Sequence, residues 1–143
     1  MNISTKTRYG FRLMVYLGLN ETSGEPTQLG EIAEKEGLSL KYLEKIVQML
    51  KRNGLVTVKR GPKGGYSLAS ESGKISLLSI YEALEGSCAV VECTDGNICD
   101  RQNLCSTANI WCDLSNVISN FFSERTLRDI INEQDKKSNM FYI

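Results

Sequence analysis

Three cysteines in the second half of the chain have the spacing of a metal-binding or redox site. Cys93, Cys99 and Cys105 are each separated by five residues, in a stretch rich in Asp, Asn and Gly. Thiolates bind soft metals, hold iron-sulfur clusters and form disulfides. The spacing is not the Cys-x-x-Cys of zinc knuckles or thioredoxin-like sites. It therefore leaves three readings open, which are a metal or cluster site, a disulfide switch and inert thiols.

Histidine is absent from all 143 residues. The absence excludes histidine general bases, Ser-His-Asp triads and histidine metal ligands. The sequence also has no nucleophile elbow and no phosphate-binding loop, so we expect a protein that is not an enzyme. Residues 1–6 lack the apolar stretch of a signal peptide, and no apolar run approaches the roughly 18 residues that a membrane span needs, so we expect neither feature. Five cysteines in such a chain predict a cytoplasmic protein without a disulfide framework.

A second group of residues has the charge to bind a polyanion. From Ser39 to Lys63 the chain has seven Lys or Arg and a single acid, Glu44, for a net charge of +6. The whole chain has no net charge, but residues 1–74 carry +5 and residues 75–143 carry −5. We therefore expect the first half of the chain, and not the second, to bind nucleic acid.

The basic residues lie in a pattern typical of a winged helix-turn-helix. Thr27 is expected to cap a short helix, and Gly37 supplies the turn that follows it. Ser39 then caps a second helix with two faces. The apolar positions, which we expect to face the core, are Leu40, Leu43, Val47 and Leu50. The polar positions on the opposite face are Lys41, Lys45, Gln48 and Arg52.

A two-stranded wing is expected after this helix, which Asn53 and Gly54 should end. The β-branched run 56–58 predicts one strand, the Gly-rich segment 61–65 a turn, and residues 66–68 the returning strand. The tip of the wing carries Lys59, Arg60 and Lys63.

Helical periodicity predicts further helices on either side of the cysteines. Residues 5–19 are apolar around most of their circumference and should form a buried first helix. Ser76 should cap another helix, which ends at Gly86. Residues 106–123 predict a long helix with an apolar stripe. The members of the stripe are Ile110, Leu114, Val117 and Phe121.

We expect the long helix to join two copies of the chain, because two half-sites about 34 Å apart need two DNA-reading heads on a symmetric frame. The alternative is that it packs back on its own subunit. Thr126 and Asp129 form a capping pair, which predicts a last short helix over residues 127–132 and a tail over 135–143.

These elements predict a mainly α fold with a small β-hairpin. Residues 1–75 should form a winged helix-turn-helix DNA-binding domain. Residues 76–105 should form a connecting helix and a cysteine loop that binds a cluster. Residues 106–143 should form a dimerisation helix, a short C-terminal helix and a tail.

The chain resembles the IscR-type family of winged-helix transcriptional regulators over most of its length. The most specific matches are the three cysteines and the segments STKTRYGFRLM, GLSLKYLEKIVQMLKRNGLV and RGPKGGY. The resemblance implies a homodimer that binds a palindromic operator in double-stranded DNA. It also implies an iron-sulfur cluster, which we expect to be of the 2Fe-2S type, on Cys93, Cys99 and Cys105. The regulated genes would serve iron-sulfur cluster biogenesis or related processes.

Two alternative functions stay open. The ending MFYI is similar to that of a related repressor of cysteine metabolism that needs no cluster, so a cluster-free regulator of that kind, acting through thiols or a protein partner, is the first alternative. A small iron-sulfur electron carrier is the second, and it would leave the DNA-reading head without a role.

The resemblance also assigns DNA-binding residues. The positions that match the family's major-groove residues are Ser39, Lys41, Tyr42, Glu44 and Lys45, and those that match its minor-groove wing are Arg60 and Gly61. Their chemistry independently suits these roles. Lys can bind the acceptors of guanine, Glu can accept a hydrogen bond from cytosine, and an Arg on a Gly-flanked turn suits a narrow minor groove.

The fourth cluster ligand departs from the family pattern. IscR-type proteins have a histidine where this chain has Ala108, and a related nitric oxide sensor has an acid where this chain has Arg8. We rank Cys88 first. It lies five residues before Cys93 in an irregular segment, so its thiol could reach a cluster held by the other three cysteines. Solvent or a loop carboxylate ranks second. The loop carboxylates are Glu92, Asp95 and Asp100. Cys112 ranks third, because we expect it to be a buried thiol of the long helix.

Overall fold

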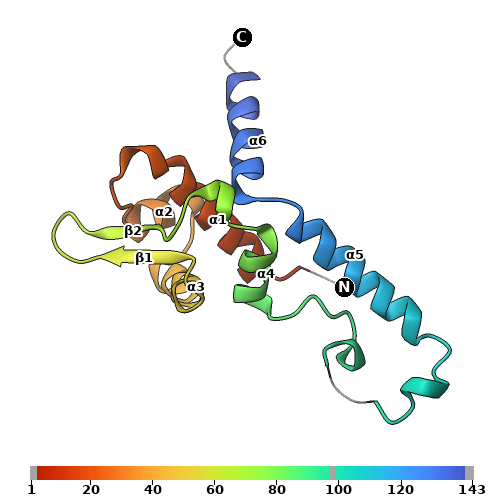
Figure 1. The fold of residues 1–143 in the computed structure, drawn as a ribbon. Coiled ribbons are helices and arrows are strands. Elements are labelled where there is room, and N and C mark those ends of the chain that lie inside the picture. The colour runs from red at the N-terminus through yellow and green to blue at the C-terminus, as the bar shows by residue number, and fades with distance from the viewer. Residues whose placement is uncertain (1–2, 97–98, 141–143) are drawn as a thin grey trace.

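The computed structural model describes residues 3–96 and 99–140, and within them the fold is mainly helical with one antiparallel hairpin, as the sequence predicts. The helices are α1 (Thr5–Leu19), α2 (Leu29–Glu36), α3 (Leu40–Arg52), α4 (Leu77–Glu85), α5 (Ala108–Ser123) and α6 (Leu127–Met140). The strands are β1 (Val56–Lys59) and β2 (Gly65–Leu68). Figure 1 shows α1, α2, α3 and the hairpin gathered in one head, with α5 leading away from it and α6 rising on a third side.

One hydrophobic core joins α1, α2, α3, α4 and α6. Its most deeply buried apolar side chains are Leu13, Met14, Ile32, Leu43, Ile46, Val47, Leu50, Ile80 and Leu127. Two glycines of α1 allow its neighbours to approach closely. A Cβ on Gly10 would lie 2.3 Å from Leu84 of α4, and a Cβ on Gly18 would lie 2.4 Å from Ile131 of α6. A larger residue at either position would force the Leu84 or Ile131 side chain to repack.

The core-facing side of α3 differs from the predicted one at its first position. Leu40 is 46% exposed, so the expectation that it faces the core is wrong. It directly follows the capping residue Ser39, and the buried row starts one turn later at Leu43. Ile46 takes a place in that row that the sequence analysis did not give it.

Thr27 does not cap α2, as the sequence analysis had expected. The helix begins at Leu29, and its N-cap residue Gln28 makes no side-chain capping bond. Thr27 instead pairs with the hairpin through an isolated antiparallel bridge to Tyr66. Its hydroxyl accepts a hydrogen bond of 2.9 Å from the side-chain amide of Asn20, the C-cap residue of α1. Thr27 therefore lies one residue before the N-cap position, and its hydroxyl bonds to Asn20 and not to a helix amide.

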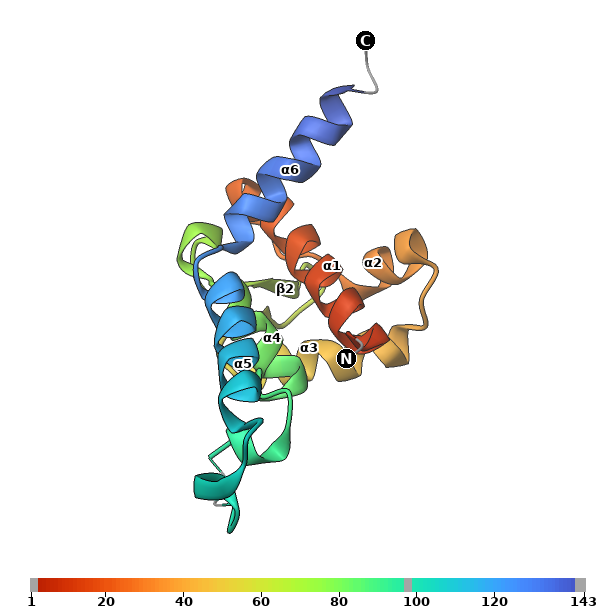
Figure 2. The same cartoon turned by 90° about the vertical axis from the view of Figure 1, so that its right-hand side faces the viewer.

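A second bridge joins the two ends of the segment that contains the cysteines. Ser76, just before α4, pairs with Thr126, just before α6. Two backbone hydrogen bonds flank this pair, from Leu77 to the Arg125 carbonyl at 2.9 Å and from Leu127 to the Ile75 carbonyl at 2.8 Å. Figure 2 shows the chain leaving the head along α4, passing through the cysteine loop and returning along α5.

The last helix is longer than the predicted short helix over 127–132. Its start is as expected, because the Thr126 amide donates a 2.7 Å hydrogen bond to the Asp129 carboxylate. The helix then continues to Met140, so the predicted tail is helical through that residue, and residues 141–143 lie outside the described part of the chain. An ion pair of 3.1 Å between Lys136 and Glu133 supports the additional turns.

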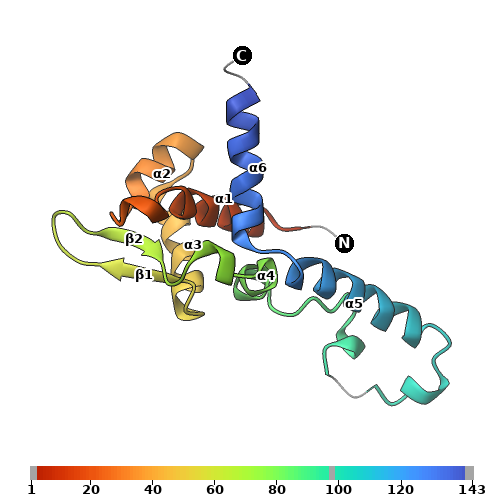
Figure 3. The ribbon, with the colours of Figure 1, turned by 45° about the horizontal axis from the view of Figure 1, so that its top comes forward.

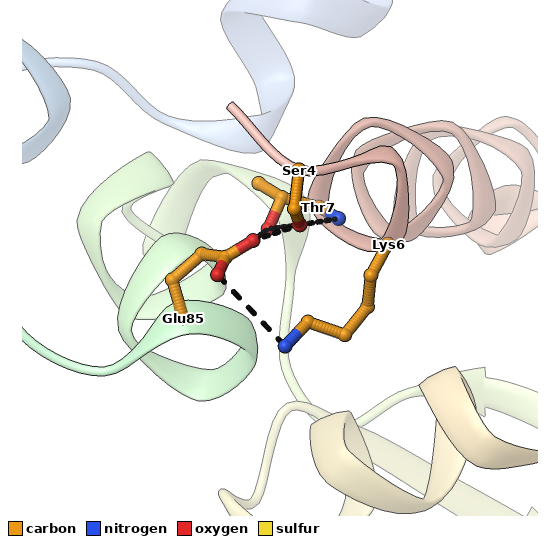
Figure 4. Close-up of polar contacts among 4 residues, drawn as sticks. All are labelled: Ser4, Lys6, Thr7 and Glu85. Atoms are coloured by element: carbon orange, nitrogen blue, oxygen red, sulfur yellow. Dashed lines mark hydrogen bonds and ion pairs between the residues drawn. The ribbon is translucent and has the colours of Figure 1, made fainter. Parts of the chain in front are cut away.

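The end of α4 is tied to the start of α1 (Figure 4). The Glu85 carboxylate accepts hydrogen bonds from the hydroxyls of Ser4 and Thr7, and Lys6 lies 3.8 Å away as an ion-pair partner. Ser4 is also the N-cap of α1. Burial raises the pKa of Glu85, but the bonds from Ser4 and Thr7 and the charge of Lys6 outweigh it, so the pKa is lowered overall.

Near its C-terminal end, helix α5 packs on α4 and α1. Phe122 stacks on Tyr81 of α4, with ring centroids 5.0 Å apart, and also contacts Phe11 of α1 at 6.1 Å. The predicted apolar stripe faces away from the head. All four of its members are exposed, and they are Ile110, Leu114, Val117 and Phe121. None of the helices in the described ranges is long and apolar enough to cross a membrane.

Candidate nucleic-acid interface and cysteine loop

The start of α3 is fixed by the turn that precedes it. Gly37 adopts a left-handed conformation, with φ of 64°, and so ends α2. The hydroxyl of Ser39 then accepts a 3.1 Å hydrogen bond from the Tyr42 amide, which caps α3 as predicted. Tyr42 is half-buried, and its ring meets that of Tyr9 edge-on at 6.3 Å. These contacts hold the first turn of α3 in one orientation on the head.

The solvent face of α3 borders a groove of about 600 Å³ that separates the helix from the wing. Because the apolar face of α3 is buried in the core, the long polar side chains must project into this groove. The lining residues are Lys41, Glu44, Lys45, Gln48, Met49, Arg52 and Tyr66. Three cations and a single acid give the groove a net positive charge, which suits a phosphate backbone.

The wing projects from the head beside this groove. Its register runs from Val56 opposite Leu68 to Lys59 opposite Gly65. The turn between the strands is closed by a 2.9 Å hydrogen bond from the Gly64 amide to the Gly61 carbonyl. Figure 3 shows the hairpin and α5 extending on opposite sides of the molecule. The wing is therefore free of the cysteine loop and open to a ligand.

The predicted DNA-binding residues fall into three places. Lys41, Glu44 and Lys45 line the groove together. Arg60 and Gly61 are exposed in the turn of the wing. Ser39 and Tyr42 lie at the start of α3 and are not among the residues that line the groove.

The groove also contains residues that the predicted site left out. Extending the helical period of the cationic face would have added Gln48 and Arg52. The half-buried residues Met49 and Tyr66 could not have been found this way. Tyr66 lies on β2, so only the folded hairpin brings it beside α3.

The cysteines occupy different environments. Cys93 lies in a short 3-10 turn, Glu92–Thr94, and is half-buried, as is Cys99. Cys105 is exposed just before α5. All five cysteines are free thiols. Cys112 is exposed on α5, so the expectation that it is buried is wrong, because the face of α5 that carries it does not meet the head.

Hydrogen bonds set the pKa of Cys105, whereas burial sets that of Cys88. The Thr107 hydroxyl, 3.4 Å from the Cys105 sulfur, lowers the pKa of this thiol, and the backbone amides of Thr107 and Ala108 act in the same direction. Burial raises the pKa of Cys88, and the nearby charge of Glu82 adds to the effect. Cys88 is only 8% exposed. Its burial and raised pKa both disfavour it as a ligand, and its first rank as fourth ligand stays a prediction.

The stretch before Cys93 is attached to α5 by one side chain. The hydroxyl of Ser115 accepts a 3.1 Å hydrogen bond from the Val90 amide and lies 3.2 Å from the Thr94 hydroxyl. Cys93 is thereby held beside the long helix. Cys105 adjoins the start of that helix, where the Ala108 amide donates a 3.3 Å hydrogen bond to the Cys105 carbonyl.

The thiols suit an iron-sulfur cluster in chemical type but not in position. Cluster ligation requires several thiolates around one small group of atoms. Among the described residues, no three or more Cys, Asp or Glu side chains gather closely enough to hold a metal ion. The three cysteines are thus on one loop but not brought together.

Comparison with known proteins gives consistent matches over nearly the whole chain. A family model named Rrf2 and described as an iron-dependent transcriptional regulator matches residues 3–133. The HTH-type transcriptional regulator IscR of Cronobacter sakazakii is 36% identical over 135 residues, which cover 94% of this chain and 83% of that protein.

Two solved structures have similar folds. One is CymR (YrzC), the global cysteine regulator of B. subtilis, with 33% identity and a TM-score of 0.75, over 93% of this chain and 98% of that one. The other is T. potens IscR, with 30% identity and a TM-score of 0.77, over 96% of this chain and 90% of that one. The similarity is therefore of equal quality to a regulator named for cysteine and to IscR.

Proposed function

The chain belongs to the Rrf2 family of DNA-binding transcriptional regulators, and on that premise we propose that two copies of it read the two halves of a palindromic operator. The family is one of regulators and not of enzymes. The observation that carries the proposal is the cationic groove between α3 and the wing, lined by Lys41, Lys45 and Arg52. In each copy, α3 would enter the major groove and the turn with Arg60 the adjacent minor groove.

The apolar stripe of α5 supports the homodimer in this proposal. Val117 is 63% exposed, Ile110 59% and Phe121 52%, although all three are apolar. A contiguous apolar face of this kind marks an interaction surface in a water-soluble fold. If a second copy of the chain were related by a two-fold axis, the apolar stripe of each α5 would cover the stripe of the other.

Selection from random double-stranded DNA, followed by titration with variants, tests the DNA-binding part. Arg60→Ala and Lys45→Ala should each cost about 1 to 3 kcal/mol on the selected operator and relax its sequence preference. Lys51→Ala is the matched control, because Lys51 is exposed on α3 but does not line the groove. It should weaken all sequences alike and reduce the salt dependence. Equal losses on selected and random DNA for all three variants would contradict the proposed base contacts.

We also propose that Cys93, Cys99 and Cys105 hold an iron-sulfur cluster, of the 2Fe-2S type, and that the regulator responds to its presence by controlling iron-sulfur biogenesis or related genes. Three thiols on one irregular loop and the lowered pKa of Cys105 support ligation. The loop would have to close to gather them, which is common where metal binding and local folding are coupled.

Anaerobic reconstitution with iron and sulfide tests the cluster. The product should bind iron and absorb visible light, and Cys99→Ala should remove both signals. Cys112→Ala should keep them, since Cys112 is exposed on α5 outside the loop. A colourless wild-type product would remove the cluster from the proposal and leave the DNA-binding part standing.

A cluster-free regulator of cysteine metabolism is the second candidate. The observation in its favour is that the thiols are free and not gathered, in a fold that matches CymR as well as it matches IscR. For this candidate, operator binding should be unchanged by reconstitution and should depend instead on thiol oxidation or on a second protein.

A further inference from the structure

One residue pair attaches the base of the wing to the segment between α1 and α2. Thr27, between α1 and α2, exchanges two backbone hydrogen bonds with Tyr66 of β2. Its amide donates to the Tyr66 carbonyl at 2.9 Å, and the Tyr66 amide donates to the Thr27 carbonyl at 2.8 Å. Thr27 is 4% exposed, so these bonds are shielded from water. The hairpin is therefore attached to the head through a third extended segment.

Gly65 allows this attachment because it has no side chain. A Cβ at this position would lie 2.5 Å from the Thr27 carbonyl oxygen and 2.7 Å from the Thr27 carbonyl carbon. Both atoms belong to the backbone, so they cannot move aside as a flexible side chain could. Any residue other than glycine must separate Tyr66 from Thr27 or shift the whole segment.

The attachment continues in both directions along the chain. Toward the head, the Thr27 hydroxyl accepts the 2.9 Å hydrogen bond from Asn20, the cap of α1. Toward the tip, Gly65 pairs with Lys59, and Arg60 is the next residue. A series of hydrogen bonds thus leads from a buried helix to the exposed arginine of the wing.

We infer that Gly65 and Thr27 are positioning residues for Arg60, and that they fix the angle at which the wing meets the DNA. This inference rests on the proposed function, in which Arg60 enters the minor groove. Gly65 contacts no DNA in this scheme. It acts by keeping the hairpin against Thr27. The backbone of the wing then has little conformational freedom left to lose when the guanidinium of Arg60 enters the groove.

Gly65→Ala tests the inference, with Gly73→Ala as the matched control because a Cβ on Gly73 would meet nothing within 4 Å. Gly65→Ala should bind the selected operator about tenfold more weakly, as expected for the loss of one contact to a base. Its binding to random DNA should stay close to that of the wild type. Arg60→Ala should cause a similar loss, and the double variant should bind no more weakly than either single one.

Amide hydrogen exchange reads the attachment without DNA. The Tyr66 amide should exchange slowly in the wild type and in Gly73→Ala, and much faster in Gly65→Ala, while core amides of α3 stay protected. Asn20→Ala covers the case in which Gly65→Ala does not fold. It adds no atom beside the bridge but removes the bond to Thr27, so it should speed Tyr66 exchange and cause a smaller loss on the operator alone.

Three results would overturn the inference. They are additive losses for Gly65→Ala and Arg60→Ala, equal losses on operator and random DNA, and an unchanged Tyr66 exchange rate in both variants. Failure of the proposed function would give a different result, because the wild-type protein would then select no DNA sequence. The exchange rate of the Tyr66 amide would still show whether Thr27 holds the wing in place.

Discussion

At the residue scale, Cys105 and Cys88 show that two thiols of one chain segment can have pKa values shifted in opposite directions. Cys105 is exposed beside the Thr107 hydroxyl, which lowers its pKa. Cys88 is buried, which raises its pKa. Because the thiolate is the form that reacts and ligates, Cys105 is more nucleophilic near neutral pH than Cys88.

Alkylation kinetics should report this difference. At pH 7, iodoacetamide should modify Cys105 well before Cys88, and the rate at Cys105 should rise with pH with a midpoint below the ordinary thiol pKa of 9.0. Thr107→Val should slow the reaction at Cys105 and move its midpoint to higher pH. Thr107→Ser, which keeps the hydroxyl, is the control and should behave as the wild type. Mass spectrometry of the modified peptides gives the rates, and identical profiles for Thr107→Val and Thr107→Ser would rule out the hydroxyl as the cause.

Single residues also mark where reasoning from the sequence failed. Ser39 was assigned correctly as a cap because a hydroxyl residue before a helical period is a local signal. Thr27 has the same local signal, but its backbone pairs with Tyr66, which is far away in the sequence. Tyr66 was missed as a groove residue for the same reason. Local patterns do not contain the long-range pairings of the hairpin.

At the scale of elements, Glu85 joins two helices that the sequence leaves unrelated. It is the last residue of α4, and its carboxylate receives hydrogen bonds from the Ser4 and Thr7 hydroxyls at the start of α1. The side chain is 23% exposed, so the ion pair with Lys6 is only partly screened by water. The amino end of α1 also favours a negative charge at this point.

This contact predicts a dependence of stability on pH. The pKa of Glu85 is lower in the folded chain than its ordinary value of 4.5, so the ionised carboxylate stabilises the fold above that value. The contribution is lost as the pH falls through the lower folded pKa. Glu85→Gln should therefore reduce the free energy of unfolding by about 1 to 2 kcal/mol at pH 7 and by less in acid.

Urea denaturation at several pH values between 3 and 7 measures this effect. Glu82→Gln, on the same helix with an exposed side chain, is the control and should follow the wild-type curve. An equal loss for Glu85→Gln at every pH would mean that the charge of the carboxylate does not matter.

The helices themselves were predicted with uneven accuracy, and the errors have a physical pattern. Helix starts with strong capping signals were predicted correctly. Examples are Ser76, which caps α4, and Asp129, which bonds to the Thr126 amide at the start of α6. The predicted end of α6 was too early. The sequence after residue 132 contains no glycine or proline, so nothing in it breaks the helix before Met140.

At the scale of the whole molecule, α5 has two faces with different partners. Phe122 packs against Tyr81 and Phe11 of the head, whereas the adjacent Phe121 is 52% exposed. Arg125 lies over the Phe121 ring at 3.9 Å and covers only part of it. Phe122 therefore stabilises the fold, whereas Phe121 lies in the apolar stripe that we propose as the dimer interface.

The same substitution at these two positions should have opposite effects. Phe121→Ala should keep the helical content and weaken the dimer about tenfold, as expected for a central aromatic contact. Phe122→Ala should lower the free energy of unfolding by about 2 kcal/mol at every protein concentration, because it removes a half-buried ring. Sedimentation equilibrium and concentration-dependent thermal unfolding distinguish the two. If Phe121→Ala dimerises as tightly as the wild type, the stripe of α5 is not the interface.

The reading head was the part of the molecule that the sequence specified best, since charge, the Ser39 cap and the turn residues agreed there, although Thr27 and Leu40 were assigned wrongly. The cysteine loop was specified least, because ligand spacing in an irregular segment says which thiols share a loop but not how close they lie. The exposed Cys112 makes the same point for α5, because a cysteine in a long helix need not be buried.

The bridge between Ser76 and Thr126 gives the molecule a modular plan. After α4, which packs in the core, the chain between those residues leaves the head through the cysteine loop and returns along α5 to the same point. The entropy of closing such an excursion grows only with the logarithm of its length, so residues can be gained or lost near the cysteines at small cost to the rest of the fold. The cysteine loop can therefore change in length or composition while the DNA-binding head stays intact.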